Sequence, residues 1–290
     1  MSTRTVRRLA SYALLAAALG FAVLVATWVL TGGHWFVVET PSMGTSAPVG
    51  TLLWVRPVGS AASLHVGDFI TFHPPGSAAT YSHRILAILP DGTIRTKGEI
   101  TGADPWRITV HDVVGRVAMR WWDVGWLIKA APILLLGALA LVPLATVVGR
   151  VAGSRWRLPT VMVGSSIVLS VVMVVVRPLT GAVQLPTAPG SQVARAAFVS
   201  TGVLPLQVDA GGPAAVVRAG EVARVVAGPA GTDGRYAVHL SPAIPWWFWA
   251  VIVLASFLPA IWTTIRPASG RSADDAGSRP HSHRAVPAAA

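Results

Sequence analysis

Residues 130–148 read AAPILLLGALALVPLATVV, an apolar run without a charged side chain. A helix that crosses a bilayer needs about 20 such residues. Three other runs have similar length and also lack charge, at residues 12–30, 158–176 and 246–265. The whole chain is 53% hydrophobic and only 12% charged, which is unusual for a soluble protein of 290 residues. We therefore predict a membrane protein with four transmembrane helices.

The positive charge of the chain is concentrated beside these runs. The formal net charge of +11 could suggest nucleic-acid binding, but 10 of the 23 basic residues lie in segments 1–11, 149–157 and 266–290, against two acidic ones. The positive-inside rule places these three segments in the cytoplasm. We therefore expect a multi-pass protein of the cell membrane with both termini cytoplasmic, the lipid bilayer as a partner and no nucleic-acid partner.

This topology divides the chain into six parts and predicts an α+β membrane protein with two extracytoplasmic β domains. The parts are a cytoplasmic stub with an uncleaved transmembrane anchor (1–30), a first extracytoplasmic domain (31–129), a transmembrane hairpin with a basic cytoplasmic loop (130–176), a second extracytoplasmic β module (177–245), a transmembrane helix (246–265) and a disordered cytoplasmic tail (266–290).

The first extracytoplasmic domain is rich in short β-like runs separated by Gly and Pro, which predicts an antiparallel β domain. Asp91 and Gly92 favour a hairpin turn between two of these runs, because both residue types tolerate the backbone angles of tight turns. The predicted strands are 52–55, 68–72, 84–89, 93–96 and 113–119.

The second module, residues 177–245, has a similar but weaker pattern and is predicted to form a small β-sandwich. It contains no paired carboxylates and no serine with a plausible base. We expect it to contribute recognition or positioning, with a partner that the sequence does not identify. The predicted strands are 198–200, 203–208, 215–218, 222–226 and 236–240.

A candidate nucleophile stands in the first extracytoplasmic domain, twelve residues beyond the apolar run that ends at Leu30. Ser42 lies in Thr40-Pro41-Ser42-Met43 and is followed along the chain by His83 and Asp104. A serine hydroxyl attacks efficiently when an imidazole accepts its proton and an acid orients that imidazole. Strand alternation would place His83 on one face with Tyr81 and Ile85.

Alternatives for the base and the acid remain open at this level. Glu99 competes with Asp104 for the role of the acid. Lys97 could serve as the base of a Ser-Lys dyad, although its neighbour Glu99 also allows a plain surface ion pair. The chain has no cysteine, which excludes thiolate catalysis and disulfides. We expect no metal and no cofactor.

Five sequence blocks, taken together, resemble the type I signal peptidases. The resemblance is to the branch of the endoplasmic reticulum, archaea and many Gram-positive bacteria, in which histidine replaces the general-base lysine, and it covers about residues 10 to 145. The blocks are TPSM (40–43), GDFITF (67–72), SHRI (82–85), TKGE (96–99) with DPW (104–106), and DVVGRV (112–117).

The resemblance implies a role for each candidate residue. Ser42 would be the nucleophile, His83 the general base and Asp104 the orienting acid. The hydroxyl of Thr40 would form the oxyanion hole together with the backbone N–H of Ser42. Glu99, which replaces the family's aspartate, would be a possible supporting acid.

Two further departures fall in the loop around the nucleophile. Thr45 stands where the family has a proline, with the proline delayed to Pro48, and Thr51 replaces an acid after Gly50. None of these changes removes a member of the triad. Residues 31–129 are therefore expected to be a signal-peptidase catalytic domain. The implied function is a membrane-bound serine endopeptidase that cuts signal peptides from exported preproteins at the outer face of the membrane. The alternative is a catalytically inactive, signal-peptidase-like protein with a binding or assembly role.

Overall fold

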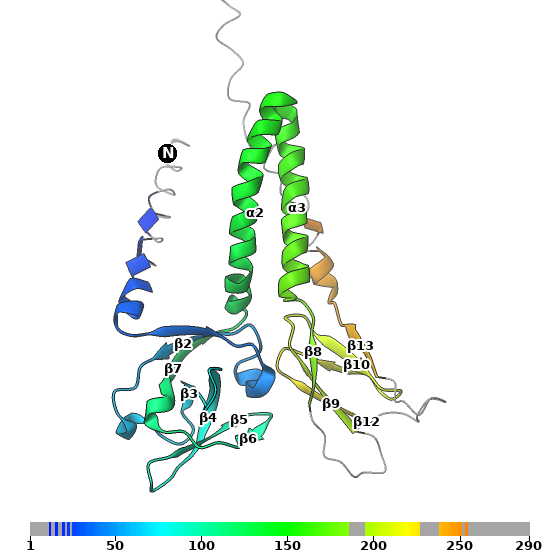
Figure 1. Ribbon diagram of the computed structural model, residues 1–290. Coiled ribbons are helices and arrows are strands. Elements are labelled where there is room, and N and C mark those ends of the chain that lie inside the picture. The colour runs from blue at the N-terminus through cyan, green and yellow to red at the C-terminus, as the bar shows by residue number, and fades with distance from the viewer. Residues whose placement is uncertain are drawn as a thin grey trace, which may run out of the picture. The chain divides into compact units, whose positions relative to one another are not determined.

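The computed structural model describes residues 12, 15–16, 19–20, 22–23, 25–185, 195–226, 238–250 and 253–254. The chain forms two compact units, Met1–Ile244 and Pro245–Ala290. The fold is α+β, and the strands within each of its sheets pair antiparallel (Figure 1).

One sheet of seven strands forms the first domain, in the order β1-β2-β7-β3-β4-β5-β6. Two apolar clusters pack on it, one around Met43, Leu53 and Phe69 and the other around Ile70, Phe72 and Ile85. The strands are β1 (His34–Val37), β2 (Leu52–Arg56), β3 (Phe69–Phe72), β4 (Tyr81–Ile88), β5 (Ile94–Gly98), β6 (Gly102–Ala103) and β7 (Val113–Trp121).

Each of the five strands predicted in this domain is present, with bounds shifted by up to three residues. The predicted hairpin turn is also confirmed. Gly92 has a φ of 80°, and the backbone N–H of Thr93 donates to Asp91 Oδ1. β1 was not predicted, because its sequence HWFV has no apolar-polar alternation.

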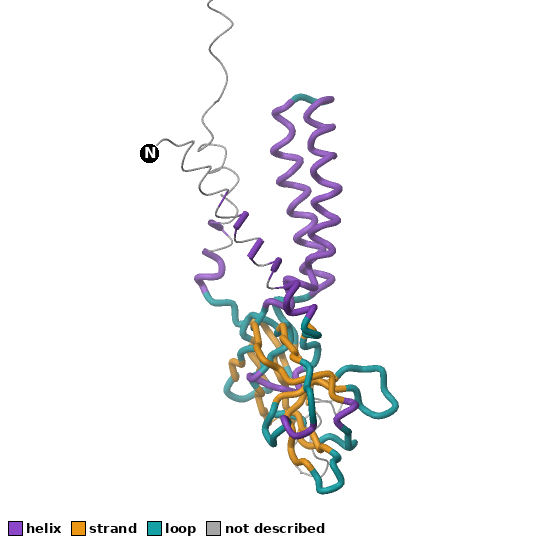
Figure 2. Tube along the Cα trace, turned by 90° about the vertical axis from the view of Figure 1, so that its left-hand side faces the viewer, coloured by secondary structure: helices purple, strands orange, loops and turns teal. Residues whose placement is uncertain are grey.

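Two long helices form a hairpin between the β domains. α2 (Val124–Val151) and α3 (Arg157–Val176) are joined by a short segment that contains η4 (Ser154–Trp156). Both are long and apolar enough to cross a membrane. They run side by side in Figures 1 and 2, and glycines lie where they meet, since a Cβ on Gly137 would come 2.6 Å from Val168. Small residues of this kind allow close helix packing in membranes.

The first and the fourth predicted spans are described only in part. The described residues between Tyr12 and Leu30 are helical, as are Trp246–Ala250 and residues 253–254. The remainder of the predicted span 246–265 and the whole predicted tail 266–290 lie outside the described residues.

The second module contains two antiparallel sheets of three strands, in the orders β11-β10-β13 and β12-β9-β8. One core joins them, because Val208 and Val217 from the first sheet pack with Phe198 and Val225 from the second. The strands are β8 (Ala182–Leu185), β9 (Arg195–Ser200), β10 (Leu206–Asp209), β11 (Ala215–Val217), β12 (Val222–Val226) and β13 (His239–Pro242).

The strand predicted from Val203 begins instead at Leu206. Pro205 has no N–H with which to join a ladder, and the N–H groups of Val203 and Leu204 donate to the carbonyls of Pro178 and Leu179. The strand predicted at 236–240 is described from His239, and residues 227–237 lie outside the described residues.

Candidate active site

The loop that carries Ser42 is a short 3-10 helix, η1 (Pro41–Ser46). Pro41 suits the first helical position, because its ring fixes φ at a helical value. The N–H that proline lacks would have no partner inside the helix at this position. The side chain of Met43 is 1% exposed and anchors the loop in the core. Gly44 breaks the helix with φ 51° and ψ −134°. The loop therefore holds Ser42, partly exposed, between a buried anchor and a sharp bend.

His83 projects from β4 toward this loop. Its Nε2 lies 2.9 Å from Ser42 Oγ. The predicted alternation of β4 is confirmed at its centre, because His83 and Ile85 are buried while Arg84 between them is not. The imidazole packs against the rings of Phe72 and Tyr81, with centroid separations of 6.3 and 5.9 Å. These neighbours leave the ring little freedom to turn.

Asp104 lies on the other side of the imidazole. Its Oδ2 is 2.7 Å from His83 Nδ1, and the two side chains are only 8% and 5% exposed. An Nδ1–H that donates to this carboxylate leaves the lone pair of Nε2 directed at Ser42, so the serine hydroxyl can donate to it. The structure thus brings Ser42, His83 and Asp104, separated by 41 and 21 residues, into one hydrogen-bonded line.

Thr96 is a further member of this network that sequence reasoning did not single out. Its hydroxyl donates to Asp104 Oδ2 at 2.5 Å, and its carbonyl accepts the N–H of Asp104. The alternation of β5 is the signal that could have found it, because Ile94, Thr96 and Gly98 are buried while Arg95 and Lys97 are exposed. The same alternation turns Lys97 away from Thr96, so a Ser-Lys dyad through Lys97 is not supported.

Glu99 does not contact His83. Its Oε2 accepts a hydrogen bond of 2.6 Å from Ser46 Oγ, and its Oε1 accepts one of 2.7 Å from Arg84 Nε. Burial opposes ionisation of Glu99, but the bonds from Ser46 and Arg84 and the charges of Arg84 and Arg120 outweigh it and lower its pKa. Arg120 also donates to the carbonyl of Ser46. Glu99 therefore holds the end of the nucleophile loop in place through its hydrogen bond with Ser46.

A cavity of about 470 Å³ opens beside Ser42 and His83. Thr40 lies on its wall with Ser42, so the two predicted oxyanion donors border the same space. Side chains of Phe36, Val38 and Leu53 supply apolar walls. We call this cavity the catalytic cleft. Glu39, Thr80 and Ser82 add polar groups to its lining.

The second module reaches the same loop. A Cβ on Gly220 would lie 2.3 Å from the carbonyl oxygen of Gly44, so the two backbones touch. Gly220 has a φ of 78° and stands in a turn in which the N–H of Glu221 donates to Arg218 O. Sequence reasoning missed this contact, because a glycine in a turn is common and gives no hint of its tertiary neighbour.

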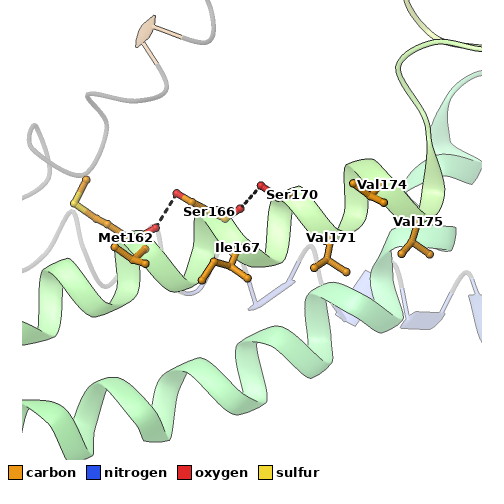
Figure 3. A pocket seen from close by; sticks show the side chains of 8 residues that line it. Met162, Ser166, Ile167, Ser170, Val171, Val174 and Val175 are labelled. Carbon is orange, nitrogen blue, oxygen red and sulfur yellow. Dashed lines mark hydrogen bonds between the residues drawn. The ribbon is translucent and has the colours of Figure 1, made fainter.

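A larger hollow of about 750 Å³ lies on α3, away from this chemistry. Figure 3 shows its lining, which is apolar except for Ser166 and Ser170. Their hydroxyls donate to the carbonyls of Met162 and Ser166 in the same helix. Because both hydroxyls already donate within the helix, the lining of the hollow offers no side chain suited to catalysis.

No cluster of three or more His, Cys, Asp or Glu side chains gathers as a potential metal site in the described ranges. Comparisons of the chain with protein-family models and with curated proteins gave no match. A functional interpretation therefore depends on the chemistry of Ser42, His83 and Asp104, whose arrangement is that of a nucleophilic serine with a histidine base.

Proposed function

We propose that this chain is a membrane-bound serine endopeptidase of the signal peptidase type. The single observation that carries the proposal is the hydrogen-bonded line from Ser42 Oγ through the His83 imidazole to Asp104 Oδ2. Any polar surface can bring a serine near a histidine. A histidine that acts as a general base also needs a carboxylate bonded to its second ring nitrogen. Here that carboxylate is Asp104, which is buried and accepts a further hydrogen bond from the Thr96 hydroxyl.

In the proposed mechanism, Ser42 Oγ attacks the scissile carbonyl carbon while His83 Nε2 takes the hydroxyl proton. The carbonyl oxygen becomes an oxyanion that the Thr40 hydroxyl and the Ser42 N–H stabilise. His83 then gives its proton to the leaving amine, and an acyl-enzyme forms on Ser42. Water, activated by the same imidazole, releases the acyl group. Asp104 remains ionised and stabilises the imidazolium in both steps.

The proposed substrate class draws on the direct connection between the catalytic sheet and an apolar helix. β7, a neighbour of β3 in the catalytic sheet, leads within a few residues into α2, which is long and apolar enough to span a bilayer. A nucleophile held near the membrane suits a scissile bond that emerges from it. The catalytic cleft, with its apolar walls, suits small side chains before that bond. Both features support signal-peptide-bearing preproteins as substrates.

The decisive experiment is cleavage of a synthetic preprotein by the full-length protein in liposomes. We expect one cut after the small residues that end the signal segment, and none with Ser42→Ala. Ser63→Ala, in a surface turn where the Ser63 hydroxyl donates to the Ser60 carbonyl, is the matched serine control and should cut normally. Binding of the preprotein by the wild-type protein without any cut would instead support the inactive binding or assembly protein.

We further propose four spans, with both termini cytoplasmic and both β domains outside. The chain has no cysteine, so single cysteines report topology cleanly. Cysteines at Ser2, Ser154 and Ser278 should react with a membrane-impermeant maleimide only after permeabilisation, and one at Ser77 should react in intact cells. The reverse pattern would overturn the orientation.

A further inference from the structure

A second groove, of about 570 Å³, borders the nucleophile loop on the side of the second module. Gly44, Thr45, Glu99 and Ile100 lie on its wall from the catalytic domain, and the charge of Glu99 is paired with that of Arg84. Val216, Glu221 and Val222 line it from the second module. We call it the intermodule groove. The turn at Gly220 packs directly on Gly44, and both glycines line the groove.

The nucleophile loop separates the intermodule groove from the catalytic cleft. Ser42 borders the cleft, and Gly44, two residues later, borders the groove. Ile100 lies between Ser42 and the groove, because its N–H donates to the carbonyl of Ser42 at 3.1 Å and Ile100 itself lines the groove. A peptide that crosses Ser42 with one arm in the cleft therefore has the groove available for its other arm.

The lining of the groove suits an extended polypeptide. Within the described part of the second module, β11 and β12 each pair with a neighbour on one side only, so their outer edges can bond to another strand. Val216, on β11, is 58% exposed and offers an apolar contact. Glu221 holds its turn by accepting the Arg218 N–H at 2.8 Å, which fixes its carboxylate at the groove.

We propose that the intermodule groove binds the part of the substrate that follows the scissile bond, as an extended chain, and disfavours acidic residues opposite Glu221. This inference rests on the proposed function, which assigns the apolar cleft to the small residues before the bond. The second module is then a specificity element for the first residues of the released protein. Its contribution is binding, since none of the module's described residues (177–185, 195–226 and 238–245) enters the Ser42–His83–Asp104 line.

A kinetic experiment tests the charge preference. The peptides share one signal segment and carry either Lys or Glu at a single position, which is the second, third or fourth residue after the bond. For each peptide, kcat/KM is measured at low salt with the full-length protein. We expect the Lys peptide to be favoured about threefold at the responsive position, the scale of one partly exposed charge pair. Glu221→Gln, which keeps an acceptor for Arg218, should bring the ratio toward one.

Asp209→Asn is the matched control, because Asp209 also accepts a turn N–H in the same module but does not line the groove. It should leave the ratio unchanged. An equal ratio in the wild-type protein and in Glu221→Gln overturns the groove assignment while the proposed function stands. Absence of cleavage of every peptide by the wild-type protein overturns the proposed function itself.

Photo-crosslinking gives a readout that needs no turnover. The full-length Ser42→Ala protein is mixed with peptides that carry benzoylphenylalanine either three residues before or three residues after the bond. We expect the second probe to label residues 215–222 and the first to label residues around the catalytic cleft. Labelling of the second module by neither probe, or by the first alone, contradicts the proposal.

Discussion

The hydroxyl of Thr96 and the imidazole of His83 share one carboxylate oxygen, Asp104 Oδ2, at 2.5 and 2.7 Å. Thr96 therefore fixes the direction of the Asp104 carboxylate. Thr96 is buried and does not line the catalytic cleft, so it is a positioning residue in the proposed mechanism.

Removal of the Thr96 hydroxyl should weaken catalysis without loss of the fold. Thr96→Val keeps the shape but leaves Asp104 with one donor fewer, so we expect kcat to fall about tenfold, the scale of one lost bond to a charged group. KM should change little, because Thr96 does not line the catalytic cleft. A lower melting temperature with an unchanged kcat would show a purely structural role. Thr96→Ser should restore kcat.

Loss of either proton-transfer partner should remove activity almost completely. We expect Ser42→Ala and His83→Ala each to lower kcat by at least about 10⁴-fold, because the two side chains act as one unit. Asp104→Asn should be nearly as damaging, since an amide favours the wrong imidazole tautomer. Cleavage of the synthetic preprotein measures all three, with circular dichroism to show that each variant folds. Substantial turnover by any of them would refute the corresponding role.

His83→Lys should not restore a working base, although lysine serves that role in the ordinary bacterial signal peptidases. The nearby Asp104 carboxylate would hold the lysine in its charged form, and the longer stem does not fit a site shaped by Phe72 and Tyr81. We expect activity close to that of His83→Ala between pH 6 and about pH 9. Near-normal turnover in this variant would mean that the site does not depend on an imidazole.

The ion pair of Glu99 should make stability depend on pH. The pKa of Glu99 is lower in the folded protein than in the unfolded chain, so its contribution is present above the unfolded pKa, near 4.5, and is lost as the pH falls through the folded value. Thermal melts at pH 7 should therefore show a lower melting temperature for Glu99→Gln than for the wild-type protein, and the gap should close on acidification below pH 4. A gap that is constant with pH would contradict the assignment.

A side chain at Gly220 should disturb the nucleophile loop from the second module. In Gly220→Ala the new Cβ would lie 2.3 Å from the Gly44 carbonyl oxygen, so one of the two backbones must move. We expect kcat to fall at least about tenfold, because small displacements of reacting groups are costly. Gly92→Ala has a similar φ, 80°, but open space around the new Cβ, and should remain fully active. Equal activity of the two variants would mean that the module does not support the loop.

Local patterns in the sequence predicted much of the fold. The apolar lengths of residues 130–148 and 158–176 predicted two helices, which the structure contains within α2 and α3. Alternation and turn residues predicted the central strands, since side chains of a half-buried strand repeat every two residues. The prediction at Val203 was wrong because Pro205 interrupts that strand, and β1 was missed because HWFV does not alternate.

The sequence by itself determined which reactive residues are present and in which order. It left Asp104 and Glu99 as competing acids, and only the tertiary structure separated them. Pairing of β5 with β6 brings the start of the Asp104 loop over Thr96, while Glu99 turns to Ser46 and Arg84. The contact between Gly44 and Gly220 was likewise decided by the fold alone. Such contacts join residues far apart in the chain, and their geometry depends on how sheets pack rather than on any periodicity along the sequence.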